Sequence, residues 1–179
     1  MTPSKTSRIR IQRVNKHNIE ETWNLANQEI PGEIASISTI EQIVTHNPDS
    51  VMLIYRDKTI VGFCAMLMLS AQGLEELLIG ELKGTGPNFR SLAPKGVAPA
   101  AIYFWAAVAP GLVSGGIMQV SRFLRDPLYR HANCYSRPNT PAGENFNTVI
   151  GFKPVICGTP GLMRYVRLAN RDDELQQAA

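Results

Sequence analysis

An almost uninterrupted apolar segment at residues 100–109 constrains the fold of this chain more than any other feature. A run of this length without a polar face is typical of a central β-strand that is buried on both faces of a sheet. Gly111, Gly115 and Gly116 follow the run, and apolar residues at helical spacing begin at Ile117. The pattern predicts a buried strand, a glycine-rich turn at residues 111–116 and a helix, an order typical of α/β proteins.

Further strands and helices are predicted on both sides of this segment. Alternating polar and apolar residues predict a strand at 8–14, and helical spacing predicts a helix at 19–30 and another one that Ser38 caps. Two β-rich runs around a polar turn predict a hairpin. The remaining expected elements are the hairpin strands at 51–55 and 59–69, a helix at 71–82, a loop at 83–99, a strand at 132–136, a helix at 141–150 and closing strands at 152–156 and 162–168.

Length and composition favour a single domain. The chain has 179 residues, of which 44% are hydrophobic and 18% are charged, so it has enough apolar material for one core. The order of elements predicts an α/β fold with one mixed, twisted central sheet flanked by helices. We expect this domain to cover residues 8–168, with flexible tails at 1–7 and 169–179.

Charge and residue spacing count against several classes of function. The net charge of +3 is too small to indicate nucleic-acid binding, and it suits a small anionic ligand equally well. Cys64, Cys134 and Cys157 form no CxxC pair and the histidines lack ligand spacing, so no metal site is expected. The polar N-terminus and the prolines in the apolar run predict a cytoplasmic protein with no membrane contact. We expect it to be a monomer or a homodimer.

The turn after the central strand has features of a phosphate site. Backbone N–H groups at a helix N-terminus attract anions, and glycines let that backbone approach a phosphate closely. The turn lacks the Lys-Ser/Thr pair of a Walker loop and the Gly-x-Gly-x-x-Gly of a dinucleotide site. The alternative is an ordinary strand-to-helix turn.

Three segments resemble motifs of the GNAT-type N-acetyltransferase superfamily. DKTIVGF at residues 57–63 is similar to the hairpin that leads into the third strand of that family. VAP at 108–110 and VSGGIM at 113–118 lie where the family has Val-x-Pro and then Arg/Gln-x-x-Gly-x-Gly/Ala. Gly151 and Phe152 follow a short helix, as in the end of the family's pattern. The resemblance extends over residues 8–168.

This resemblance implies acetyl-CoA or another acyl-CoA as co-substrate, in a cleft where two central strands splay apart. The backbone of residues 106–108, ending at Val108, would pair with the pantetheine arm, and Asn139 would lie beside that arm. The acceptor would be an amine of a small molecule or peptide. The pyrophosphate would bind backbone N–H groups of six residues, Val113, Ser114, Gly115, Gly116, Ile117 and Met118.

Direct acyl transfer from a thioester to an amine needs a neutral amine, an oxyanion donor and in-line placement of the substrates. Among the acidic residues of segment 71–82, Glu81 is the first candidate to accept the amine proton, directly or through water; the alternative is a solvated helix face. Asn147 stands where the family usually has a tyrosine acid. Tyr135, at the end of the preceding strand, is therefore expected to protonate the CoA thiolate.

Several residues keep two interpretations. Tyr103 and Trp105 share one face of the central strand, where they line an acceptor pocket or fill the core. Asn147 and Met118 depart from the family pattern, which leaves a non-catalytic CoA-binding or protein-interaction module as the alternative function. Four arginines either bind CoA phosphates or lie on a solvated surface, namely Arg122, Arg125, Arg130 and Arg137. They also allow a third and weaker hypothesis for the function of the protein, nucleic-acid binding.

Overall fold

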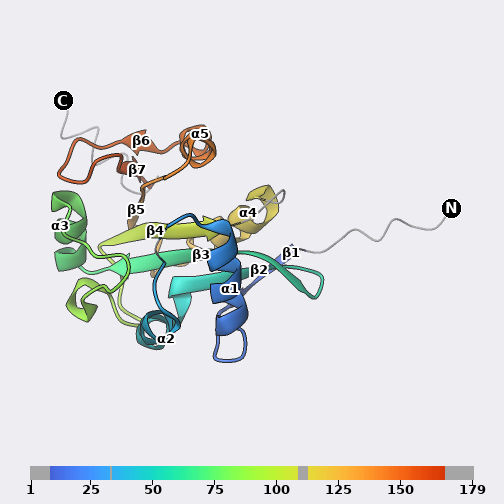
Figure 1. Cartoon of the computed structure of the whole chain (residues 1–179). Coiled ribbons are helices and arrows are strands. Elements are labelled where there is room, and N and C mark those ends of the chain that lie inside the picture. Colours follow the sequence, from blue (N-terminus) through green and yellow to red (C-terminus); the bar gives the residue numbers. More distant parts are fainter. Residues whose placement is uncertain (1–8, 33, 109–112, 168–179) are drawn as a thin grey trace.

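A seven-stranded mixed sheet with helices on both faces forms the fold in the computed structural model, which describes residues 9–32, 34–108 and 113–167. The strand order is β1-β2-β3-β4-β5-β7-β6, and β4 and β5 are the parallel pair in an otherwise antiparallel sheet (Figure 1). The fold class predicted from the sequence is confirmed. The expected domain ends at 8 and 168 and both expected tails lie outside the described residues.

The elements follow the predicted order closely, with the central strand and the hairpin nearly where the apolar patterns place them. They are β1 (Ile9–Arg13), α1 (Ile19–Glu29), α2 (Ile37–His46), η1 (Pro48–Ser50), β2 (Val51–Arg56), β3 (Thr59–Leu69), α3 (Ala71–Ile79), η2 (Phe89–Ser91), β4 (Ala101–Val108), α4 (Val113–Phe123), β5 (Asn133–Ser136), α5 (Pro141–Ile150), β6 (Lys153–Pro154) and β7 (Met163–Tyr165). None of these helices is long and apolar enough to span a bilayer.

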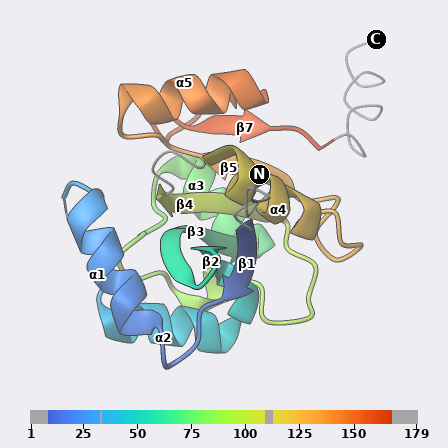
Figure 2. The ribbon, with the colours of Figure 1, turned by 90° about the vertical axis from the view of Figure 1, so that its right-hand side faces the viewer.

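The two faces of the sheet carry different helices. On one face, α1 and α2 pack over β2 and β3 in a cluster that includes Ala26, Leu53 and Phe63, and α3 packs beside them through Leu77. On the other face, Val120 of α4 packs against Met52 and its neighbours. Figure 2 shows α1 and α4 on opposite sides of the strands. The sheet is therefore covered on both faces, which explains why β3 and β4 are mostly apolar.

Some local predictions are wrong. Ser36, not Ser38, caps α2, because its side chain accepts the backbone N–H of Thr39 at 3.1 Å and Ser38 already lies inside the helix. The loop at 83–99 contains the short η2 helix. The closing strands are shorter than expected, since β6 has two residues and β7 has three.

The glycines of VSGGIM lie inside α4, which starts at Val113, rather than in a turn that precedes the helix. A Cβ added to Gly116 would lie 2.6 Å from Ile54 Cδ1, and one on Gly115 would lie 3.5 Å from Ile9 Cγ1. Gly116 is therefore needed for the close approach of α4 to the sheet. Gly111 lies outside the described residues.

We expect Gly116→Ala to lower the free energy of unfolding by about 1–3 kcal/mol, the usual cost of overpacking. Ile54 is fully buried, and the added Cβ would lie within 3.1 Å of three of its side-chain atoms, so Ile54 or α4 would have to shift. Gly115→Ala is the matched control, because its Cβ would make an ordinary contact and alanine favours a helix by about 1 kcal/mol over glycine. Urea unfolding of the two variants measures the difference, and equal stabilities would contradict this packing role.

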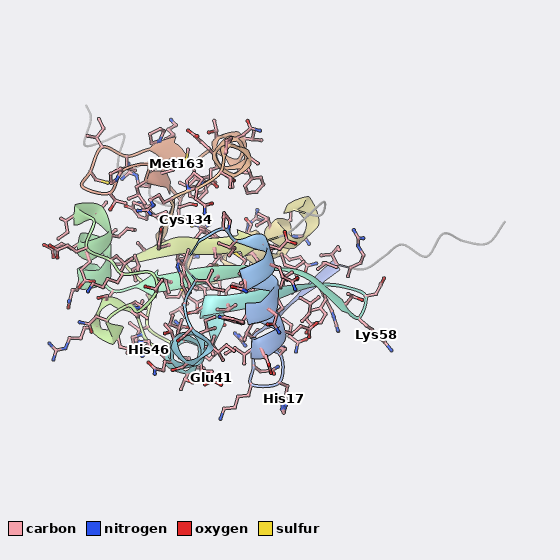
Figure 3. All side chains as sticks on the ribbon, viewed as in Figure 1. His17, Glu41, His46, Lys58, Cys134 and Met163 are labelled. Atoms are coloured by element: carbon pink, nitrogen blue, oxygen red, sulfur yellow. The ribbon has the colours of Figure 1, made fainter. Side chains whose placement is uncertain are left out.

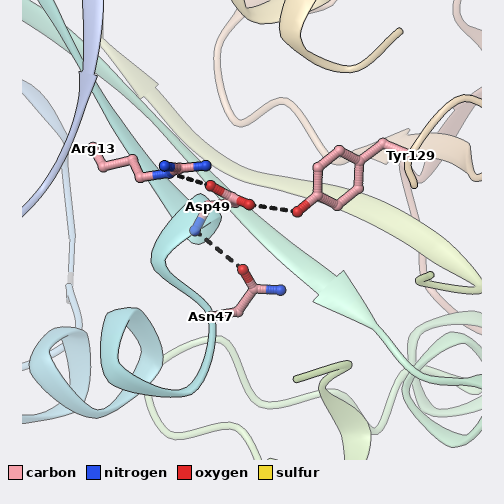
Figure 4. Close-up of polar contacts among 4 residues, drawn as sticks. All are labelled: Arg13, Asn47, Asp49 and Tyr129. Carbon is pink, nitrogen blue, oxygen red and sulfur yellow. Dashed lines mark hydrogen bonds and ion pairs between the residues drawn. The ribbon is translucent and has the colours of Figure 1, made fainter. Parts of the chain in front are cut away.

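A buried polar network joins η1 to a residue 80 positions after Asp49 in the chain (Figure 4). Asp49 is buried, pairs with Arg13 Nε and accepts the Tyr129 hydroxyl at 2.5 Å. Its backbone N–H donates to Asn47 Oδ1 at 3.1 Å. Burial, and then the hydrogen bond to Asp49, raise the pKa of Tyr129, so the hydroxyl remains a donor.

Asp49→Ala is expected to lower the free energy of unfolding by about 2–4 kcal/mol, because it leaves the buried Tyr129 hydroxyl without its acceptor. Glu41→Ala is the control, since Glu41 is an exposed carboxylate on α2 and its loss should cost at most about 0.5 kcal/mol. Chemical denaturation measures both values. A loss for Asp49→Ala no larger than that of the control would show that the network does not stabilise the fold.

Candidate active site

A cleft of about 700 Å³ lies where β4 separates from β5. One wall is β4 from Tyr103 to Ala107, and the opposite wall is formed by residues 136–140 and by α5. The cleft extends under α1 and α2, where its wall is mostly apolar. Ile117 of α4 also lines the cleft, so the cleft has lining residues on both faces of the sheet.

The separation of β4 from β5 has a visible cause in the strand register. The parallel pairing ends at Phe104 opposite Ser136, although β4 continues to Val108. Ala65 pairs with Ala106 and Met66 pairs with Phe104, so Trp105 is the extra residue of a β-bulge. A bulge bends and twists its strand, which turns β4 away from β5.

The backbone of residues 105–108 consequently has no strand partner on the β5 side within the described part of the chain. We call this stretch the open edge of β4. Residues Trp105, Ala106 and Ala107 on it line the cleft. An unpaired edge of this kind can pair with an extended ligand as if the ligand were an added strand.

The charge distribution in the cleft is simple. Arg137 is the one Asp, Glu, Lys or Arg side chain among the described lining residues, and no carboxylate lies among them. Tyr103 adds a phenolic hydroxyl. Burial raises the pKa of Tyr103, and the nearby positive charge of Arg137 opposes that shift. The cleft therefore offers one cation and one protonated phenol between largely apolar walls.

No protein-family model matches the sequence, and no curated protein matches it either. Solved structures do match. The loading GNATL domain of CurA from Lyngbya majuscula has a TM-score of 0.60 at 10% identity, covering 89% of this chain and 98% of that one. A GNAT family acetyltransferase from Listeria monocytogenes has a TM-score of 0.56 at 9% identity, covering 90% and 95%.

A third structure, Arabidopsis thaliana Naa50 in complex with the bisubstrate analogue CoA-Ac-MVNAL, has a TM-score of 0.54 at 14% identity. The match covers 87% of this chain and 95% of that chain. The chain has the GNAT fold. Structural similarity at identities this low establishes the fold alone, so the activity has to be argued from the cleft.

The structure brings some of the expected cofactor residues of the GNAT pattern to the cleft. Asn139 and Ile117 line it. Val108 ends the open edge but is buried and does not line the cleft, and Met118 is 55% exposed outside it. Gly115 and Gly116 face the sheet.

Two expected cofactor residues and part of a motif are described less fully. Val113 and Ser114 form the start of α4, and their side chains lie outside the description. Ala109 and Pro110 of the VAP motif also lie outside the described residues. The binding roles predicted for these residues stay predictions.

The two expected catalytic residues do not line the cleft. Tyr135 is 5% exposed and packs in the cluster of Leu67, Leu69 and Leu162. Glu81 is exposed just after α3, between Gly80 and Leu82, which do line the cleft. Their catalytic roles therefore remain predictions without a direct contact to the cleft.

Other residues of the sequence analysis have clearer positions. Tyr103 and Trp105 line the cleft and also contact the core, and the role predicted for them in an acceptor pocket stays a prediction. Asn147 lines the cleft and donates to Met163 Sδ at 3.9 Å. Glu76 accepts the Ser91 hydroxyl at 2.5 Å, which gives it a structural role.

Sequence reasoning did not identify the apolar end of the cleft under α1 and α2. Thr22 and Ala26 of α1 and Ala35 after it line this end. In the sequence, this end of the cleft is indicated only by Thr22 and Ala26, two small residues four positions apart on the apolar face of a helix that otherwise carries large side chains. Small residues there leave space between the helix and the sheet.

The described residues include no cluster of three or more His, Cys, Asp or Glu that could hold a metal ion. Figure 3 shows His17, His46 and Cys134 on separate parts of the molecule. Burial raises the pKa of the Cys134 thiol to about 11, so it is a poor nucleophile.

Proposed function

We propose that this protein transfers an acyl group, most simply acetyl, from acyl-CoA to an amine of a small molecule or peptide. The observation that carries the proposal is the open edge of β4, which borders a cleft that reaches both faces of the sheet. The Naa50 structure of the same fold contains a bisubstrate analogue built from CoA and a peptide. A thioester arm and an amine that enter such a cleft from opposite faces meet near its centre.

The open edge and α4 would hold the cofactor. The backbone of residues 106–108 would pair with the pantetheine arm, with Asn139 beside it, as the GNAT resemblance implies. The backbone N–H groups of residues 113–116 would bind the pyrophosphate, because the first four N–H groups of a helix have no intrahelical partners, whereas the expected N–H groups of Ile117 and Met118 lie beyond this first turn. The position of Ile117 in the cleft wall supports this orientation.

In the reaction, the lone pair of the neutral amine attacks the thioester carbonyl, which a backbone amide near Val108 would polarise. The C–N bond forms, the C–S bond breaks and CoA leaves as a thiolate. Water would take the amine proton, since no described carboxylate lines the cleft, and would pass it to Glu81 or to bulk solvent. The thiolate then takes a proton from an acid in the cleft.

Tyr103 is our candidate for that acid, in place of the expected Tyr135. The support is that Tyr103 lines the cleft, whereas Tyr135 is buried in the core. Its hydroxyl is protonated at neutral pH and can donate to the leaving thiolate, although burial raises the pKa of Tyr103 and so makes the phenol a weaker acid.

A non-catalytic CoA-binding module is the second candidate. Two observations favour it: Asn147 occupies the place of the usual tyrosine acid, and no carboxylate lies among the described lining residues. An amide side chain is not a useful proton donor at neutral pH.

Thiol release from acetyl-CoA distinguishes the two candidates. For an acyltransferase we expect CoA to appear at a rate that depends on both enzyme and amine, with the N-acetyl product confirmed by mass spectrometry. Amino acids, amino-acid amides and short peptides form the first acceptor panel. Binding of acetyl-CoA with no amine-dependent release across that panel would favour the module and overturn the proposed enzyme.

A further inference from the structure

We infer that the acceptor of this reaction carries a carboxylate close to its amine, and that Arg137 binds this carboxylate. The inference rests on the proposed function and adds the chemical class of the acceptor. It would make Arg137 a residue that determines specificity rather than a catalytic one.

Arg137 is available for a ligand. Its side chain is exposed and lines the cleft, and it forms no hydrogen bond or ion pair with any described residue. A guanidinium has five N–H donors and is always charged. With no described carboxylate in the cleft wall, nothing in that wall competes with an anionic ligand for it.

The position of Arg137 separates it from the expected phosphate end of the cleft. Tyr135, two residues before Arg137, packs in the cluster that α3 covers, and Arg137 directly follows the end of β5. A Cβ on Gly161 would lie 3.9 Å from Arg137 Cγ, and its neighbour Leu162 belongs to that cluster too. The α4 helix lies on the other face. Arg137 therefore lies on the acceptor side.

The same face carries the apolar end of the cleft. Thr22, Ala26, Ile30 and Ile40 line it. An acceptor with a carboxylate on Arg137 and an apolar body in this space would satisfy both features. The cation also disfavours acceptors with a second positive charge, because like charges in a partly desolvated cleft repel.

Guanidinium and carboxylate groups form two parallel hydrogen bonds, which gives geometric selectivity as well as affinity. An uncharged amide in place of the carboxylate loses these charge-assisted bonds. We expect acids to bind about 10- to 100-fold more tightly than the corresponding amides.

N-acetyl-L-leucine and N-acetyl-L-leucinamide test this inference, because as product analogues they require no turnover and differ in one charged group. Their Kd values are measured by calorimetry on protein saturated with CoA. We expect at least tenfold tighter binding of the acid. Arg137→Gln should remove that preference and leave the Kd for CoA unchanged, while the matched control Arg56→Gln, an exposed arginine on β2 outside the cleft, should retain both.

Equal binding of the acid and the amide to the wild-type protein would overturn the inference, and so would a preference that survives in Arg137→Gln. A variant that loses CoA affinity instead would place Arg137 at the cofactor and overturn it as well. Failure of CoA itself to bind would be seen before any analogue is added; it would remove the proposed function, and the inference with it.

Discussion

Tyr103→Phe is expected to lower the kcat for amine acetylation about a hundredfold, which is within the range for loss of a general acid. The ring and its packing on β4 stay in place, so the Kd for acetyl-CoA should not change. The reason for the loss is that the CoA thiolate would have to take its proton from water. Steady-state kinetics of thiol release give kcat, and calorimetry gives the Kd.

Two further variants make this prediction specific. Tyr55→Phe removes a hydroxyl from β2 outside the cleft and should leave kcat unchanged. Tyr135→Phe tests the residue that the sequence indicated. If Tyr135→Phe lowers kcat strongly and Tyr103→Phe does not, the acid is Tyr135, and the assignment of Tyr103 is wrong.

Ala107→Trp is expected to abolish measurable binding of acetyl-CoA. Ala107 lies on the open edge of β4, is exposed and lines the cleft. An indole at this position would therefore fill the space that the pantetheine arm would need. Binding is measured by calorimetry, and the melting temperature of the unliganded variant checks that it folds.

Ile156→Trp is the control for that variant, because Ile156 is fully exposed and lies outside the cleft. It should bind acetyl-CoA as the wild type does. Normal affinity in a folded Ala107→Trp protein would contradict the placement of the cofactor on the open edge.

The sequence predicts the fold well where the hydrophobic pattern is strong. The apolar run at 100–109 became β4 (Ala101–Val108), and the two β-rich runs became the β2–β3 hairpin. Prediction was poorest at the sheet end formed by β6 and β7. There, Gly158 packs against α3 and Gly161 adopts a positive φ, so the backbone leaves the strand conformation. Such contacts between distant segments leave no periodic signal.

The candidate site was only partly predictable for the same reason. The bulge at Trp105 depends on the register between β3 and β4, and the register depends on pairs such as Ala65 and Ala106. Gly116 was recognisable as a glycine, but its neighbour Ile54 comes from a strand 62 residues earlier in the chain. Glu81 had the right chemistry for a base, yet α3 ends before it and leaves it exposed.

The melting temperature of the purified protein with and without acetyl-CoA tests the central claim, that this cleft binds acyl-CoA, most directly. A ligand present at about 100 times its Kd adds roughly 2.7 kcal/mol to the free energy of unfolding, which gives a clear upward shift. We predict that shift in the wild type and in Ile156→Trp, and none in Ala107→Trp. No shift in the wild type with acetyl-CoA, longer acyl-CoAs or free CoA would contradict the account and leave only the GNAT fold.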